Sequence, residues 1–139
     1  MDQIEIMTAA DNNLAFPLGA LAANLAALSS PASPTRLTVL VAAGAPAEIT
    51  GIAEAANSDY FSVRRIEVPD RLAQDLKGTY RVTPATYYRL FAPWLLDLPR
   101  VIHIDVDTLP MTSLRELLRC QPGDQKTSGE IAQTLTPQT

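Results

Sequence analysis

Apolar segments rich in β-branched residues alternate with segments patterned as helices, and this alternation restricts the chain to few folds. The strand-like segments cover residues 3–9, 36–42, 61–68 and 101–105. Helical segments are expected at residues 17–28, 46–57, 72–77, 84–93 and 114–119. An order of β-α-β-α-β-α-β predicts an α/β fold, in which a mostly parallel sheet carries helices on both faces.

The composition is that of one globular domain. The 139 residues are 47% hydrophobic and 19% charged, a balance that excludes a disordered chain. The net charge of −4 argues against a general attraction to nucleic acid. The single Cys120 cannot form an internal disulfide, which fits a reducing, cytoplasmic compartment.

Neither a secretory signal nor a membrane span is expected. The N-terminus has no basic region of the kind that begins a signal peptide. The longest apolar stretch, residues 14–28, is interrupted by Pro17, Gly19 and Asn24. It is also shorter than the ~20 residues that a spanning helix needs, so we interpret it as a buried helix.

The clearest helix start in the chain is Thr83-Pro84, because threonine is a good N-cap and proline fits the first turn. Pro93 is expected to end or kink this helix. Its apolar face at helical spacing consists of Tyr87, Leu90, Phe91 and Trp94. We interpret Tyr87 and Tyr88 as core and helix-surface residues rather than as a platform that stacks on a ring.

The segment at residues 101–105 runs into two carboxylates, Asp105 and Asp107, one residue apart. Alternate residues of a strand share a face, so these carboxylates are expected to converge. Converging like charges repel unless a cation or a shared proton joins them. Two interpretations stay open: a divalent metal site, for which carboxylates favour Mg²⁺ or Mn²⁺, or a solvated turn completed by Thr108 and Pro110.

A second polar loop, Asp11-Asn12-Asn13, follows the first strand. Ligands of parallel sheets bind beyond the carboxyl ends of the strands, so the two loops would share one crevice if strands one and four are neighbours. Asp11 and Asn13 suit the edge of a base or a ribose hydroxyl, and Arg89 is the candidate counter-charge. The alternatives are an ordinary Asx turn for the loop and a salt bridge for Arg89.

His103 and Asp105 are two residues apart, so in a strand they would lie on the same face. There His103 is either a metal ligand or a histidine hydrogen-bonded to a neighbour. Cys120 has no base nearby and is given no catalytic role. The sequence contains no recognisable Ser-His-Asp arrangement and no glycine-rich phosphate loop.

Three segments in this order and spacing, residues 7–13, 86–91 and 100–109, resemble the family 8 glycosyltransferases. That family includes bacterial galactosyl- and glucosyltransferases of lipopolysaccharide synthesis and the glycogenins. The resemblance extends over about residues 3–119. It implies a Rossmann-like GT-A fold and the Mn²⁺-dependent (or Mg²⁺-dependent) transfer of a hexose from a UDP-sugar to a hydroxyl, with retention of anomeric configuration.

The resemblance also implies which residues form the site. Asp105 and Asp107 would bind the metal, which would bridge the diphosphate and neutralise charge on the leaving UDP. The residues implied for the donor site are Ala9, Asp11, Asn13, Arg89, Asp105 and Val106. No catalytic residue is implied within the chain.

The sequence departs from the family at two points. Leu14 stands where the family often has a tyrosine that stacks on uracil, so this stacking is lost or replaced. Family members also continue well past the strand at residues 101–105. Residues 1–119 are therefore expected to form the N-terminal portion of a truncated GT-A domain, and residues 120–139 a polar, poorly ordered tail. An exposed core would then favour self-association.

Two other functions stay open. One is an inactive remnant that at most binds UDP, a metal or a partner. The other is a metal-dependent, phosphate-handling hydrolase, which would need a further acid or base after the strand. For a transferase, the resemblance implies a sugar or lipid-linked glycan as acceptor and a cytoplasmic location, including the inner face of the membrane.

Overall fold

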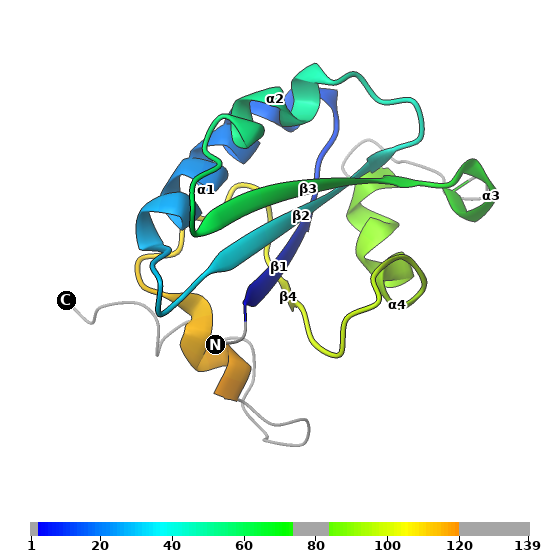
Figure 1. Cartoon of the computed structure of the whole chain (residues 1–139). Helices are drawn as coiled ribbons and strands as arrows, with labels where there is room; N and C mark the ends of the chain where they lie inside the picture. Colours follow the sequence, from blue (N-terminus) through cyan, green and yellow to red (C-terminus); the bar gives the residue numbers. More distant parts are fainter. Residues whose placement is uncertain (1–2, 74–83, 120–139) are drawn as a thin grey trace.

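The computed structural model describes residues 3–73 and 84–119 (Figure 1). The strands are β1 Ile4–Ala9, β2 Thr35–Ala42, β3 Phe61–Val68 and β4 Ile102–His103. The α-helices are α1 Ala15–Leu28, α2 Glu48–Glu54, α3 Asp70–Ala73 and α4 Ala92–Leu95. The 3₁₀ helices are η1 Asn12–Leu14, η2 Pro84–Phe91 and η3 Leu114–Arg119.

The strands form one parallel sheet in the order β3-β2-β1-β4. β1 pairs with β2 along its whole length, whereas β4 pairs with β1 only at Ile6↔Ile102 and Met7↔His103. The predicted α/β fold with a parallel sheet is therefore confirmed. Since β1 and β4 are neighbours, the polar loops that follow them leave the same edge of the sheet.

Alternate residues of the strands supply two apolar clusters on opposite faces of the sheet, which is the pattern of strands covered on both sides. The first cluster joins strand residues to α1 and α2 and includes Ile6, Leu21, Leu37, Val39 and Ile49. The second joins them to η2 and α4 and includes Met7, Leu40, Val68, Tyr88 and Leu96. Figure 1 shows α1 and α2 along one side of the sheet and α4 on the other, so helices cover both faces as predicted.

The segment after Pro84 differs from the predicted α-helix. It is a 3₁₀ helix over Pro84–Phe91, followed by the short α4. Its buried residues are Ala85 and Tyr88, whereas Leu90 is 59% and Trp94 75% exposed. The predicted apolar face was therefore wrong for Leu90 and Trp94, whereas Phe91 packs against the second cluster. A 3₁₀ helix has about 3.0 residues per turn, so Ala85, Tyr88 and Phe91, each three residues apart, lie on one side.

Other boundaries shift by a few residues. α2 is confined to Glu48–Glu54, and its predicted first residue, Pro46, instead accepts a turn hydrogen bond from the Ile49 N–H (3.2 Å). The segment predicted as helical at residues 72–77 is described only at its start, as part of α3. Thr83, Cys120 and the predicted tail at residues 120–139 lie outside the described residues. Within residues 3–73 and 84–119, no helix has the length and apolar character needed to cross a membrane.

Candidate functional site

Two cavities lie side by side at the carboxyl edge of the sheet, and Ala85 lines both of them. The first, here called the Asx cavity, has a volume of about 390 Å³ and is lined by Ala10, Asp11, Asn12, Asn13, Ala42, Ala45, Pro46, Ile49, Pro84, Ala85 and Tyr88. The second, here called the carboxylate cavity, has a volume of about 430 Å³ and is lined by Thr8, Ala9, Leu14, Ala85, Thr86, Arg89, His103, Asp105, Val106 and Asp107. The predicted crevice is thus two adjoining cavities.

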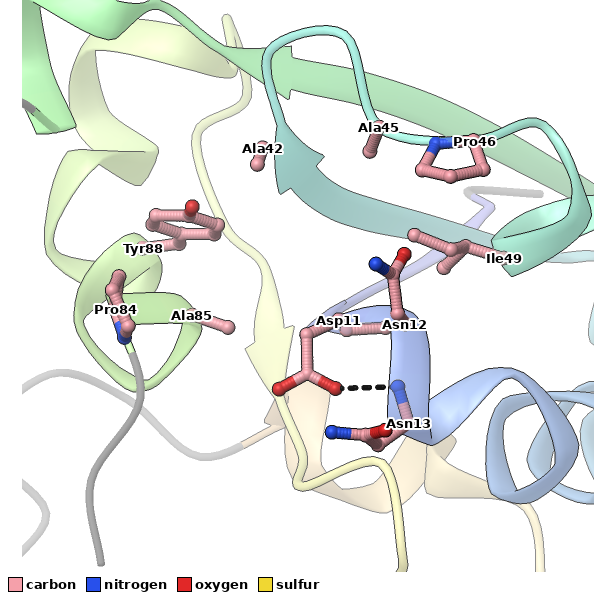
Figure 2. Close-up of a pocket in the computed structure, with 11 residues that line it drawn as sticks. Asp11, Asn12, Asn13, Ala42, Ala45, Pro46, Ile49, Pro84, Ala85 and Tyr88 are labelled. Carbon is pink, nitrogen blue, oxygen red and sulfur yellow. Dashed lines mark hydrogen bonds between the residues drawn. The ribbon is translucent and has the colours of Figure 1, made fainter. Parts of the chain in front are cut away.

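The Asx cavity begins where β1 ends and the chain turns into η1. Asp11 caps η1: its Oδ1 accepts a hydrogen bond from the Asn13 backbone N–H at 2.9 Å, as in an Asx turn. This hydrogen bond occupies Oδ1 of Asp11. The second carboxylate oxygen of Asp11 and the side-chain amide of Asn13 can therefore make other contacts. Figure 2 shows the Asn12 side chain extending toward the wall that contains Ala45 and Ile49.

That wall runs from the end of β2 at Ala42 through the following loop to Ile49 in α2, and two side chains of β3 hold the loop. Arg65 donates hydrogen bonds to the backbone carbonyls of Ala45 and Pro46, the latter at 3.0 Å. The Glu67 carboxylate accepts from the Gly44 N–H at 3.0 Å and pairs with Arg65 at 3.4 Å. Gly44 has φ +74°, a conformation that glycine adopts readily. The position of this wall is therefore set by charged residues on the neighbouring strand.

Tyr88 forms part of the opposite wall (Figure 2). The side chain is buried, with only 5% exposed. Burial raises the pKa of its hydroxyl, and the nearby carboxylates of Asp70 and Asp11 raise it further. The hydroxyl is therefore protonated at neutral pH and can donate a hydrogen bond.

The carboxylate cavity is built around a turn that follows β4. The strand was expected to continue to Asp105, but it ends at His103. The Ile104 N–H still donates to the Met7 carbonyl at 3.1 Å, and a turn then closes with the Thr108 N–H donating to the Asp105 carbonyl at 3.0 Å. The same-face argument for the two aspartates was therefore wrong, since Asp107 lies in a turn and not in a strand.

The turn nevertheless directs both carboxylates to one cavity. Val106 is buried in the apolar cluster beneath α1, while Asp105 and Asp107 on either side of it are exposed. Both aspartates line the carboxylate cavity. The buried valine thus anchors the turn, and its neighbours face the solvent.

Four further polar side chains line the carboxylate cavity, namely Thr8, Thr86, Arg89 and His103. Arg89, at the end of η2, is exposed and supplies positive charge. His103 is half-buried, and this burial lowers its pKa, with Arg89 acting in the same direction and Asp105 in the opposite one. Neutral imidazole is accordingly its main form at pH 7. Thr8 is 1% exposed, and its Oγ1 has no hydrogen-bond partner among the described residues.

The residues present fit a hard divalent cation as a partial ligand set. In the described part of the chain, no group of three or more His, Cys, Asp or Glu side chains is placed to hold a metal ion. The two aspartates offer carboxylate oxygens in an open cavity, which is the chemistry that Mg²⁺ or Mn²⁺ uses when a ligand's phosphates and water complete its shell.

The structure distributes the predicted site residues between the two cavities. Asp11 and Asn13 line the Asx cavity. The predicted residues that line the carboxylate cavity are Ala9, Arg89, Asp105, Val106 and Asp107. Sequence reasoning missed Asn12 and Tyr88, as well as the wall at residues 42–49. Only Asn12 carried a signal, through its place in the Asx loop, because the wall depends on contacts from β3.

Comparisons with known proteins agree with this fold. The chain matches the family model "Glycosyl transferase family 8" over residues 5–137, so the match continues beyond residue 119, where the resemblance was expected to end. No curated protein sequence gave a significant match.

Solved glycosyltransferase structures share the fold. An LgtC structure, titled as the active-site mutant Q189E, aligns with a TM-score of 0.71 and 26% identity over 85% of this chain and 42% of that one. A galactosyltransferase LgtC complexed with donor and acceptor sugar analogues aligns with a TM-score of 0.67 and 24% identity, over 85% and 43%. The bifunctional glycosyltransferase WbbM aligns with a TM-score of 0.70 and 23% identity, over 86% and 21%.

The chain thus spans less than half the length of each of these solved chains. The match to the family model, by contrast, covers residues 5–137 of the 139 residues of this chain. The parallel four-stranded sheet with helices agrees with that match. The chain belongs to glycosyl transferase family 8.

Proposed function

We propose that the carboxyl edge of the sheet binds a UDP-sugar together with a divalent metal, Mn²⁺ or Mg²⁺. The observation that carries this proposal is the pair of adjoining cavities, one with two carboxylates and an arginine, the other with apolar walls and an Asx loop. The first suits a metal-bound diphosphate, and the second suits a nucleoside. Ala85 lines both, so one extended ligand can occupy the two cavities together.

In this proposal, each side chain has a physical role. Asp105 and Asp107 hold the metal, which supplies charge stabilisation to the departing diphosphate. Arg89 adds positive charge beside the phosphates. Ala9 and Val106 pack against the donor, while Asp11 and Asn13 hydrogen-bond the nucleoside.

The reaction proposed for the whole enzyme is hexose transfer from the UDP-sugar to a hydroxyl acceptor, with retention. A role in lipopolysaccharide synthesis is part of the same proposal, with a sugar or lipid-linked glycan as acceptor. LgtC supports a sugar donor, since one of its structures contains donor and acceptor sugar analogues. A cytoplasmic location and self-association remain predictions.

Calorimetric titration with UDP tests the binding proposal. We expect binding to the full chain that depends on Mn²⁺ and that weakens at least about ten-fold in Asp105→Asn, since a charge-assisted contact is worth roughly 1.5–3 kcal/mol. The matched control is Asp97→Asn, because Asp97 is exposed and lines neither cavity. Metal-independent binding, or equal affinities in the two variants, would contradict the proposal.

Transfer is tested separately from binding. The purified chain is incubated with UDP-glucose or UDP-galactose, Mn²⁺ and a free sugar as acceptor, and UDP release is measured with and without the acceptor. Metal-dependent UDP release that Asp105→Asn abolishes supports an active transferase. Metal-dependent binding without UDP release supports the alternative, a protein that binds the nucleotide and metal without transferring sugar.

A further inference from the structure

Tyr88 is a buried residue whose hydroxyl has no hydrogen-bond partner in the part of the chain that the structure describes. Only 5% of the residue's surface is exposed, and in the described residues its hydroxyl forms no hydrogen bond with another residue. A buried tyrosine hydroxyl usually has a partner, because leaving it without one costs free energy. This side chain therefore needs an explanation beyond its packing.

The hydroxyl is not sealed inside the protein. The described side chains with a fully buried, unpartnered polar atom are Thr8, Asn24 and Arg64, and Tyr88 is not among them. Tyr88 lines the Asx cavity, and Figure 2 shows its ring between Pro84 and the end of β2 at Ala42. The small exposed part of Tyr88 is therefore open to this cavity.

The charged groups that act on the hydroxyl are the carboxylates of Asp70 and Asp11, neither of which forms a hydrogen bond with it among the described residues. The cavity wall beside it consists of alanine, proline and isoleucine side chains, and the Asx loop stands across the cavity from it (Figure 2). Leu14, which follows that loop, lines the carboxylate cavity rather than this one. A flat, polar-edged ligand in the Asx cavity would meet apolar walls, the Asx loop on one side and Tyr88 on the other.

We propose that the Tyr88 hydroxyl donates a hydrogen bond to the nucleoside of the bound nucleotide and so helps to determine which nucleotide the site accepts. This inference rests on the proposed function and adds a specificity residue to it. The raised pKa of Tyr88 keeps the hydroxyl in its donor form across the physiological range. A site built to hydrogen-bond a ligand group discriminates well against ligands that lack the group.

The test compares Tyr88→Phe with the unmodified chain by calorimetry, using UDP with Mn²⁺ and pyrophosphate with Mn²⁺ as the two probes. The substitution removes only the hydroxyl oxygen. We expect UDP affinity to fall roughly three- to ten-fold, the value of one neutral hydrogen bond. Pyrophosphate affinity should not change, because this probe has no nucleoside. Tyr87→Phe is the control, since Tyr87 lines neither cavity.

The outcomes distinguish the proposed role of Tyr88 from the proposed function of the site. Unchanged UDP affinity in Tyr88→Phe would overturn the inference while leaving the proposed function intact. An equal loss for UDP and pyrophosphate would also overturn it, because that pattern marks a general structural effect. If the unmodified chain binds pyrophosphate with Mn²⁺ but gains nothing from the nucleoside of UDP, the nucleoside site and the Tyr88 role both fail.

Discussion

At the scale of single residues, the site depends on polar groups placed beside buried apolar ones. Val106 is packed in the core while Asp105 and Asp107 face the carboxylate cavity. Tyr88 likewise belongs to the apolar cluster that contains Met7 and Leu40, and among the described residues its hydroxyl has no hydrogen-bond partner. In each case the packing fixes the backbone, so the polar atoms are held in position before a ligand arrives.

The desolvated Tyr88 hydroxyl predicts a change in stability at alkaline pH. Its pKa in the folded protein is raised above the ordinary value of 10.0, so the folded state holds the proton more tightly than the unfolded chain. This contribution is fully present below the unfolded pKa and is lost as the pH rises through the folded one. We therefore expect the unmodified chain to lose stability relative to Tyr88→Phe above about pH 10.

Urea unfolding of both proteins between about pH 8 and 11 measures this difference. Other groups that titrate in this range affect both proteins alike, so only the difference between the two curves matters. Stability curves that stay parallel across the range would show that folding does not perturb Tyr88.

At the scale of secondary-structure elements, the α1–α2 contact places a glycine against a neighbouring side chain. A Cβ atom built on Gly19 would lie 2.4 Å from Cγ2 and 3.3 Å from Cβ of Ile52. Gly51 is also helical, but apart from its chain neighbours and the backbone of its own helix, no atom of the described residues lies within 4 Å of the Cβ position there. Gly19 is therefore required by the close approach of Ile52, whereas at Gly51 there is room for a larger side chain.

Alanine substitutions at these glycines are expected to change stability in opposite directions. Gly51→Ala should stabilise the protein by roughly 0.5–1 kcal/mol, because alanine loses less backbone entropy in a helix. Gly19→Ala should destabilise it, since overpacking typically costs about 1–3 kcal/mol. The free energy of unfolding in urea measures both. A stabilising Gly19→Ala would mean that Ile52, which is 53% exposed, moves aside freely.

The loop held by β3 gives a second prediction at this scale. Arg65→Met removes the hydrogen bonds to the Ala45 and Pro46 carbonyls, so the wall of the Asx cavity should lose its fixed position. We expect UDP affinity to fall about three- to ten-fold, with little change in pyrophosphate affinity. Arg71→Met is the matched control, because Arg71 is exposed on α3 and lines neither cavity. Equal UDP affinities in the two variants would contradict this role.

The elements also show what a sequence alone can predict. β2 was placed within a residue because its β-branched, nearly continuous apolar run fits a strand between two layers. β3 was also placed correctly, although it is an edge strand that carries Arg64, Arg65 and Glu67. The 3₁₀ form of Pro84–Phe91 was missed, since Tyr87, Leu90 and Trp94 follow an α-helical period that the folded segment does not use. The end of β4 at His103 was also missed, because β4 pairs with β1 over only two residues.

The site was predictable to the extent that its residues lie next to strand ends. Asp11 and Asp105 follow β1 and β4 directly, so the alternation of strands and helices was enough to bring their loops to one edge. The wall at Ala45 and Pro46 was not predictable, because Arg65 reaches it from a different strand. A contact between residues this far apart in the sequence cannot be predicted from a local sequence pattern.

At the scale of the whole molecule, the residues that stabilise the fold and the residues that line the cavities lie in different parts of the parallel sheet. The two apolar clusters cover its faces, while both cavities open at its carboxyl edge. The ion pair between Arg36 and Glu5, at 2.8 Å, lies toward the other end of the strands. Variants at the carboxyl edge should therefore affect ligand binding more than folding, as is general for open α/β sheets.

The central claim, a metal-dependent nucleotide site at Asp105 and Asp107, is tested most directly by locating bound Mn²⁺ in the protein. Substoichiometric Mn²⁺ is added with UDP to ¹⁵N-labelled chain, and the paramagnetic broadening of each backbone amide signal is measured. We predict the strongest broadening at the turn after β4 and at the end of β1, and its loss in Asp105→Asn with Asp107→Asn. Uniform broadening, or broadening that survives in this double variant, would contradict the account.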